Sequence, residues 1–278
     1  MLESSPENYT EVDNCQCLTV EQAITNLKGE DQGLQYYAAW WLGRFRVQEP
    51  EVIEALIAAL DDETNRTELG GYPLRRNAAR ALGKLGDCQA VPALIVCLDC
   101  SDFYVREAAV QSLGTLGDCR CVPELMKLLE GGLAVAQPIP GSPHLAQPYN
   151  LIMEVLGSLG ANEAIDLIEP FLEHSVELLQ YSAARAMYQL TQNPIYAERL
   201  VQALAGEKLL LRRAALSDLG AIGYLPAAKA IAQTSTENNL KLIALKGLLE
   251  HHVKNYSPES SSISDTATHL MNLMDKLL

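Results

Sequence analysis

Basic side chains are scarce in this sequence of 278 residues, and aromatic ones are scarcer. Lysine and arginine number 21 against 35 aspartates and glutamates, which leaves a formal net charge of −14. Binding to nucleic acid relies on clustered cations that displace counterions from phosphates, so this balance argues against it. Aromatic residues make up 6% of the chain, and Leu and Ala outnumber Val, Ile and Thr. That composition favours helices over sheets.

Long apolar runs and signal-like segments are also absent. No stretch approaches the roughly 20 consecutive apolar residues that a membrane-spanning helix needs, and residues 1–14 are polar and acidic. The seven cysteines are too few for a disulfide-rich secreted domain. Cys15/Cys17 and Cys119/Cys121 lack the spacing and the histidines of a zinc site. We therefore expect a cytoplasmic protein with no metal site and no membrane span.

A repeated motif organises the chain. The run LGKLGDC at 82–88 aligns with LGTLGDC at 113–119, and related copies begin at Leu42, Leu156, Met187 and Leu219. Each unit holds two apolar segments with helical spacing, joined by a Gly-Asp turn, with a proline in the first turn of the second segment. Helix–turn–helix units of about 31 residues, repeated about six times, predict an all-α solenoid of HEAT-like repeats.

The whole chain, residues 1–278, is interpreted as one solenoid domain. Residues 1–30 form an N-terminal segment, residues 31–255 hold the repeats, and residues 256–278 form a linker and a terminal helix. Two insertions, 61–73 and 133–147, lengthen connections from one unit to the next, so both should emerge on the same edge. Without helical periodicity, 133–147 is expected to be an unpacked loop. The insertions are either tolerated surface loops or borders of a binding surface.

One helix carries aromatic side chains where the other repeats are mostly polar. Tyr36 and Trp40 occupy two such positions, one helical turn apart, so both are expected to face solvent. With Arg44 nearby, this stripe suits a flat ligand or a partner helix. The alternative is that residues 1–30 fold back and cover it.

Their neighbours align with smaller or apolar residues. Tyr37 and Trp41 are therefore interpreted as flanking the packed face, and they could be core residues. The regular core positions of the same helix are Leu34, Ala38, Leu42 and Phe45.

The remaining candidates are basic. Arg75 and Arg106 share one repeat position, so a structural role in pairing with turn aspartates competes with a binding role. His144 is the polar candidate from the insertion 133–147. The sequence has no Ser/His/Asp or Cys/His signature and no phosphate-binding glycine loop. The residues alone therefore define a helical solenoid with an aromatic patch.

A resemblance extends this interpretation. The repeat unit is similar to the HEAT-like repeat named after phycobilisome lyases, and YYAAWWLGR at 36–44 resembles a motif of their E-type subunits. The repeat similarity covers nearly the whole chain but is shared with many HEAT-like proteins, whereas the YYAAWWLG run is short and more specific. The resemblance implies the alpha (E-type) subunit of a cyanobacterial heterodimeric lyase, acting with an F-type subunit.

The resemblance also implies a reaction: phycocyanobilin is attached through a thioether to a cysteine of the apo-phycocyanin alpha subunit. The bilin is then a substrate chromophore, no cofactor is expected, and the nucleophile belongs to the acceptor protein. Aromatic rings can stack on pyrrole rings, and arginines can bind the propionates. The candidates for binding bilin or partner are Tyr36, Tyr37, Trp40, Trp41, Arg44, Arg75, Arg106 and His144.

Two alternatives stay open at this point. The first is a lyase subunit for another phycobiliprotein, phycoerythrocyanin or phycoerythrin. The second is a HEAT-like scaffold that binds protein without catalysis. No residue in the sequence identifies a general acid.

Overall fold

The computed structural model describes residues 18–255 and 263–278, and these residues form helices and no strands. The all-α solenoid predicted from the repeats is confirmed. The helices are α1 (Val20–Lys28), α2 (Gln32–Phe45), α3 (Pro50–Ala59), α4 (Pro73–Leu85), α5 (Val91–Val96), α6 (Phe103–Leu116), α7 (Val122–Lys127), α8 (Tyr149–Ser158), α9 (Ile165–Ile168), α10 (Glu177–Thr191), α11 (Pro194–Ala203), α12 (Leu209–Ile222), α13 (Ala228–Gln233), α14 (Asn238–Asn255) and α15 (Asp265–Asp275).

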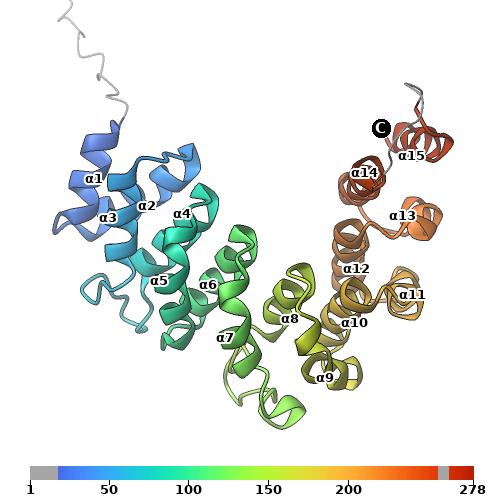
Figure 1. Cartoon of the computed structure of the whole chain (residues 1–278), viewed down its shortest axis with the longest axis horizontal. Coiled ribbons are helices and arrows are strands. Elements are labelled where there is room, and N and C mark those ends of the chain that lie inside the picture. The colour runs from blue at the N-terminus through green and yellow to red at the C-terminus, as the bar shows by residue number, and fades with distance from the viewer. Residues whose placement is uncertain (1–17, 256–262) are drawn as a thin grey trace, which may run out of the picture.

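The helices form two rows that follow an arc (Figure 1). The inner row consists of α2, α4, α6, α8, α10, α12 and α14, each of which contacts the next. The outer row consists of α3, α5, α7, α9, α11 and α13. The exposed sides of the inner-row helices therefore form a concave surface, and α1 and α15 lie at the two ends of the arc.

The first glycine of the repeated Leu-Gly-x-Leu-Gly motif explains the curvature. A Cβ atom at Gly83 on α4 would lie 2.5 Å from the Ser112 Oγ on α6, and one at Gly43 on α2 would lie 2.7 Å from the Ala81 Cα on α4. Neighbouring inner helices thus approach more closely than any larger residue allows. Because the inner row is packed this tightly, it occupies the inside of the arc.

The second glycine ends the helix. Gly86 and Gly117 follow α4 and α6 with φ of 79° and 71°, the left-handed conformation that favours glycine. The next residues, Asp87 and Asp118, accept backbone N–H bonds that start a short 3₁₀ turn. The Gly-Asp pair therefore turns the chain from an inner helix to an outer one.

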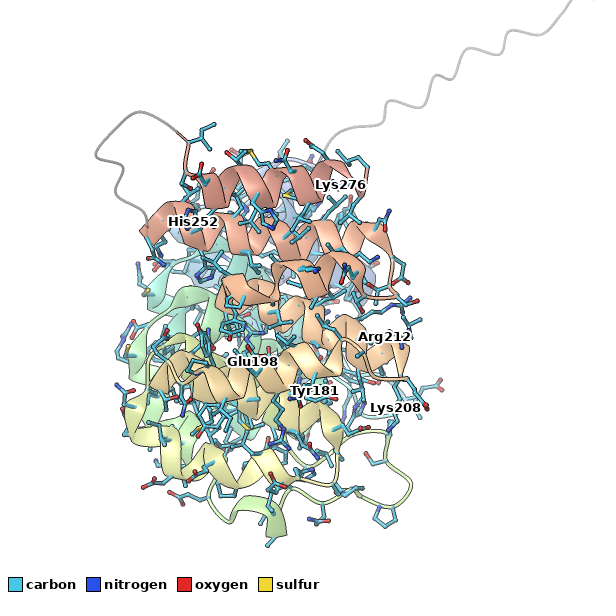
Figure 2. The ribbon with its side chains drawn as sticks, turned by 90° about the vertical axis from the view of Figure 1, so that its right-hand side faces the viewer. Tyr181, Glu198, Lys208, Arg212, His252 and Lys276 are labelled. Carbon is cyan, nitrogen blue, oxygen red and sulfur yellow. The ribbon has the colours of Figure 1, made fainter. Side chains whose placement is uncertain are left out.

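The two insertions lie on one edge of the solenoid. They precede α4 and α8, so they emerge where inner helices begin, the edge that Lys208 and Arg212 mark in Figure 2; His252 marks the opposite edge. The expectation of an unpacked 133–147 loop holds for residues 137–143, which are exposed, but not for the flanking residues, of which Leu133 and Leu145 pack against the core. Ala136 is fully buried, and its carbonyl oxygen lies 2.8 Å from the Nε2 of the buried His174.

A helix with two buried apolar residues packs at each end of the solenoid. Ala23 and Leu27 of α1 are buried against the first helices, and Ala267 and Leu270 of α15 are buried at the other end. No helix in the described part of the chain is both long enough and apolar enough to cross a bilayer.

Candidate functional site

The YYAAWW run places its residues on three sides of α2. Tyr36 and Trp40 lie on the concave surface, with 39% and 42% of their area exposed, as the repeat alignment predicts. Ala38 and Ala39 are buried in the core. The helix α1 leaves both aromatic residues exposed, and residues 1–17 lie outside the described part of the chain.

A second side of α2 faces the open end of the inner row. Leu34, Tyr37 and Phe45 are 46%, 47% and 61% exposed. The core positions expected for Leu34 and Phe45 are therefore wrong, and Tyr37, for which a core position was left open, is also exposed. Trp41 is half-buried, and its ring centre lies 5.0 Å from that of Phe45. These four residues form what we call the end face.

The repeat geometry explains why these positions are exposed. Asn77, the equivalent of Tyr37 in the next repeat, donates to the Tyr36 carbonyl oxygen on the preceding helix. Ala81, the equivalent of Trp41, packs against Gly43 of that helix. Both positions are therefore covered by the preceding inner helix, and α2 begins the inner row.

Arg75 and Arg106 anchor the insertions. Arg75 donates through Nε to the Asp62 carbonyl oxygen at 2.6 Å, and its guanidinium lies 4.7 Å from the centre of the Tyr72 ring. Arg106 donates through Nη2 to the Ala146 carbonyl oxygen at 2.7 Å. Their partners lie mainly in the insertions rather than in the turns, so the expected pairing with turn aspartates is replaced by loop anchoring.

Two other arginines face the concave surface without such partners. Arg76 and Arg80 lie one turn apart on α4, at the positions equivalent to Tyr36 and Trp40, and both are half-buried. Within residues 18–255 and 263–278, neither has an ion pair or a hydrogen bond. The Arg76 Nε is buried with no acceptor. Sequence reasoning missed both, although the repeat alignment already placed them beside the aromatic stripe.

His144 joins an insertion to this surface. Its ring stacks on Phe103 with centres 4.2 Å apart, and its Nε2 lies 2.9 Å from the Tyr104 hydroxyl. The Arg76 guanidinium lies 5.7 Å from the centre of the Tyr104 ring. A hollow of about 390 Å³ opens here, lined by Thr67 and residues 69–73 of the other insertion together with Arg76, Phe103 and Tyr104. The insertion 61–73 therefore borders a polar and aromatic cleft, and His144 of the other insertion contacts two residues that line it, Phe103 and Tyr104.

Further along the concave surface, an arginine bridges two carboxylates. The Arg185 Nη1 lies 3.0 Å from the Glu154 Oε2 and 3.1 Å from the Asp218 Oδ1, joining α8, α10 and α12. Burial raises the pKa of Asp218 to about 7, because desolvation of its carboxyl group outweighs the opposite effect of Arg185. The carboxyl group of Asp218 therefore keeps its proton to a higher pH than an exposed aspartate does.

Metal-ligating side chains are dispersed over the part of the chain that the structure describes. Within it, no group of three or more His, Cys, Asp or Glu residues is arranged to hold a metal ion. The side chains gathered at the candidate site are aromatic and basic, which suits a flat anionic ligand.

Comparison with known proteins extends these observations. Residues 34–62 match the family described as PBS lyase HEAT-like repeat, and residues 70–134 match HEAT repeats. A phycocyanobilin lyase subunit alpha from Nostoc sp. (strain PCC 7120) is 61% identical over 280 residues, covering 100% of both chains. The bilin biosynthesis protein PecE from that strain is 44% identical over 262 residues, covering 94% of this chain and 96% of its own.

A solved structure gives the same result in three dimensions. It is the complex of CpcE and CpcF of phycocyanin lyase from Nostoc sp. PCC7120, and the matching chain is 61% identical. The superposition has a TM-score of 0.86 and covers 99% of this chain and 100% of that chain. The similarity therefore spans the full length and is not limited to the repeat motif.

Proposed function

The chain belongs to the family of phycocyanobilin lyase alpha subunits, and from this premise we propose where it holds the bilin. It is one subunit of a heterodimeric enzyme that acts with an F-type partner and attaches phycocyanobilin to the phycocyanin alpha subunit. Phycocyanobilin lyase alpha subunits share more residues with this chain than PecE does, which favours this bilin and acceptor over the alternatives.

The bilin lies on the concave surface across α2 and α4. Tyr36 and Trp40 present flat, exposed rings at successive turns of α2, and such rings stack on conjugated pyrroles. Their neighbours on α4 are Arg76 and Arg80. A flat ligand with two carboxylates matches this pairing of two rings with two cations.

The observation that carries the proposal is the pair of half-buried arginines that have no hydrogen bond or ion pair within the described residues. Removing a guanidinium from water without a hydrogen-bond acceptor is costly, and Arg76 keeps its Nε in that condition. The two propionates of phycocyanobilin supply charge-assisted acceptors for Arg76 and Arg80. Arg44 adds a third, more exposed cation at the end of α2.

In the reaction, the sulfur of the acceptor cysteine adds to the ethylidene group of ring A. A C–S bond forms, the carbon–carbon double bond is consumed, and a proton is added to the neighbouring carbon. The role of this chain is to hold the bilin extended, with one face turned toward the thiol. The cleft at His144 and Tyr104 lies beside Arg76, and it is where the acceptor protein reaches ring A.

The end face takes the F-type partner. Leu34, Tyr37, Trp41 and Phe45 are apolar and occupy the side that the next inner helix, α4, buries. Exposed apolar surfaces of this kind are typical of protein–protein contacts. The partner covers the end face and leaves Tyr36 and Trp40 open. We place this complex in the cytoplasm, with the bilin as its substrate and no further cofactor.

Binding of the free bilin tests the site. The purified chain, alone and with the F-type subunit, is titrated with phycocyanobilin and its visible spectrum is followed. Arg76→Gln/Arg80→Gln should weaken binding about 100-fold, or about tenfold for each charge-assisted contact. Arg213→Gln is the matched control, because Arg213 occupies the same repeat position on α12 but is paired with Glu237.

The dimethyl ester of phycocyanobilin separates charge from shape. It keeps the conjugated rings but lacks both carboxylates, so the double variant should bind it as the unmodified chain does. Trp40→Ala should weaken binding of both ligands. The proposed site is wrong if the double variant binds the free diacid with unchanged affinity, or if no spectral shift occurs in the heterodimer.

A further inference from the structure

Cys97 and Cys100 form a C-x-x-C pair that the proposed function does not use. Cys97 begins the 3₁₀ turn Cys97–Asp99 at the end of α5 and Cys100 follows it, and the Cys100 N–H donates to the Cys97 carbonyl oxygen at 3.2 Å. Both are free thiols; Cys97 is buried and Cys100 is partly exposed. Residues that close such a turn have Cα atoms less than about 7 Å apart, the separation that a disulfide spans.

Cys100 lies where the anchors of both insertions meet. Arg75, which holds Asp62, also directs its Nη1 to the Cys100 Sγ at 3.8 Å. Arg106, which holds Ala146, donates through Nη1 to the Cys100 carbonyl oxygen at 2.5 Å. A change at Cys100 therefore acts on the two arginines that anchor the insertions.

We propose that Cys97 and Cys100 form a reversible dithiol–disulfide site, oxidised by a small disulfide such as glutathione disulfide. The Cys100 sulfur attacks the small disulfide, giving a mixed disulfide and releasing one glutathione thiol. The Cys97 sulfur then attacks the Cys100 sulfur and releases the second. One glutathione disulfide is reduced, one protein disulfide forms, and the two thiol protons are transferred to the two glutathione molecules.

Burial sets the order of the two steps. It raises the pKa of the Cys97 thiol to about 12, with a smaller contribution from the neighbouring Cys100. Only the thiolate attacks a disulfide, so Cys97 reacts slowly at neutral pH and Cys100, which is more exposed, reacts first. Closure of the mixed disulfide should therefore accelerate as the pH rises.

The disulfide changes how the insertions are held. Oxidation ties the Cys100 sulfur to Cys97 and takes from Arg75 the thiol that it contacts. Arg75, which precedes Arg76 in the sequence and holds the Asp62 carbonyl oxygen of the insertion 61–73, then loses its contact with the Cys100 thiol. This consequence for bilin attachment rests on the proposed function, whereas the thiol chemistry does not.

Peptide mapping tests the thiol chemistry in the full chain. Cys88→Ser removes the third cysteine of the tryptic peptide 85–106 and serves as the background. After incubation with glutathione disulfide and alkylation, this peptide should carry the Cys97–Cys100 disulfide. Cys97→Ala should stop at the mixed disulfide on Cys100, and Cys100→Ser should leave Cys97 free. Closure of a preformed mixed disulfide should accelerate about tenfold per pH unit between pH 7 and pH 9.

The same peptide mapping can also contradict the proposal. The proposal is overturned if Cys97 and Cys100 are both recovered as alkylated thiols at every ratio of oxidised to reduced glutathione. It is also overturned if Cys97→Ala gains no glutathione at Cys100, while the exposed Cys119 in the same sample does.

Trypsin provides the readout for the loop, because Arg66 is exposed within the insertion 61–73. Cleavage after Arg66 should be several-fold faster in the oxidised protein and should return to its original rate with dithiothreitol. Attachment of bilin with the F-type subunit should fall and recover in parallel. Unchanged cleavage with the disulfide formed refutes the link to the loop. Faster cleavage with unchanged attachment supports the link and counts against the proposed bilin site.

Discussion

The imidazole Nε2 of His144 lies 2.9 Å from the hydroxyl of Tyr104, which is 40 residues earlier in the chain. His144 belongs to the insertion 133–147, and Tyr104 lies in the first turn of α6, where its ring faces the Arg76 guanidinium. This contact connects the insertion 133–147 to α6, at a tyrosine that lines the cleft beside Arg76.

A double-mutant cycle measures that contact. His144→Ala and Tyr104→Phe each remove the hydrogen bond, and neither side chain is buried. Each substitution should lower the free energy of unfolding by about 1 kcal/mol, and the double variant by less than the sum. Urea unfolding gives the three values; strictly additive effects would mean that the two groups do not interact in solution.

Trp40 should contribute to bilin binding, whereas Trp41 should contribute to the stability of the fold. Trp40→Ala removes an exposed ring, so the free energy of unfolding should change by less than about 0.5 kcal/mol while bilin binding falls. Trp41→Ala removes a half-buried ring that packs on the core and on Phe45, and should cost about 2–4 kcal/mol. Thermal melts compare them. If both variants lose the same amount of stability in the isolated chain, Trp40 has a structural role.

The close approach of inner helices makes Gly83 a sensitive position. Gly83→Ala should lower the free energy of unfolding by about 1–3 kcal/mol, because the new Cβ would meet the Ser112 Oγ at 2.5 Å and force α4 and α6 apart. Lys84→Ala, at the exposed neighbour, is the control and should change stability by less than about 0.5 kcal/mol. Denaturant melts of both variants are the measurement, and equal effects would contradict the tight packing.

Because of Asp218, the free energy of unfolding should decrease as the pH rises. In the folded protein its pKa is raised to about 7, whereas an aspartate in an unfolded chain titrates near 3.9. Between about pH 4 and pH 7 the folded state therefore binds more protons than the unfolded chain, and this contribution to stability is lost as the pH rises.

Comparison with Asp218→Asn isolates that contribution. The free energy of unfolding of the unmodified protein should decrease relative to that of the variant between pH 5 and pH 8. Chemical denaturation at several pH values gives this difference. A difference that stays constant, or that changes in the opposite direction, would show that the Arg185 ion pair rather than burial controls the titration.

Comparison of equivalent positions predicted much of the surface but failed at the first repeat. It placed Tyr36 and Trp40 in solvent because their equivalents are polar, and both are exposed. It placed Leu34 and Phe45 in the core because it treats every inner helix as having a predecessor. The helix α2 has none, and the same positions that are buried elsewhere are open at the end face.

The roles of the arginines show a different limit. Arg75 and Arg76 are adjacent, and nothing in their local sequence says which one anchors a loop and which one faces the concave surface. The answer depends on where the Asp62 carbonyl oxygen and the Tyr104 ring lie after folding. Likewise, the convergence of Arg75 and Arg106 on Cys100 depends on residues from two different repeats.

The sequence by itself determined the repeat, the helical solenoid, the shared edge of the two insertions and the exposure of Tyr36 and Trp40. These follow from local rules. Apolar periodicity sets the helices, Gly-Asp turns connect them, and stacking of equivalent units forms the solenoid. Tertiary structure alone decided the open end face, the arginines without partners and the anchoring of the insertions. Each of these depends on contacts between groups distant in sequence, and the position of such groups is set only when the inner helices pack against one another.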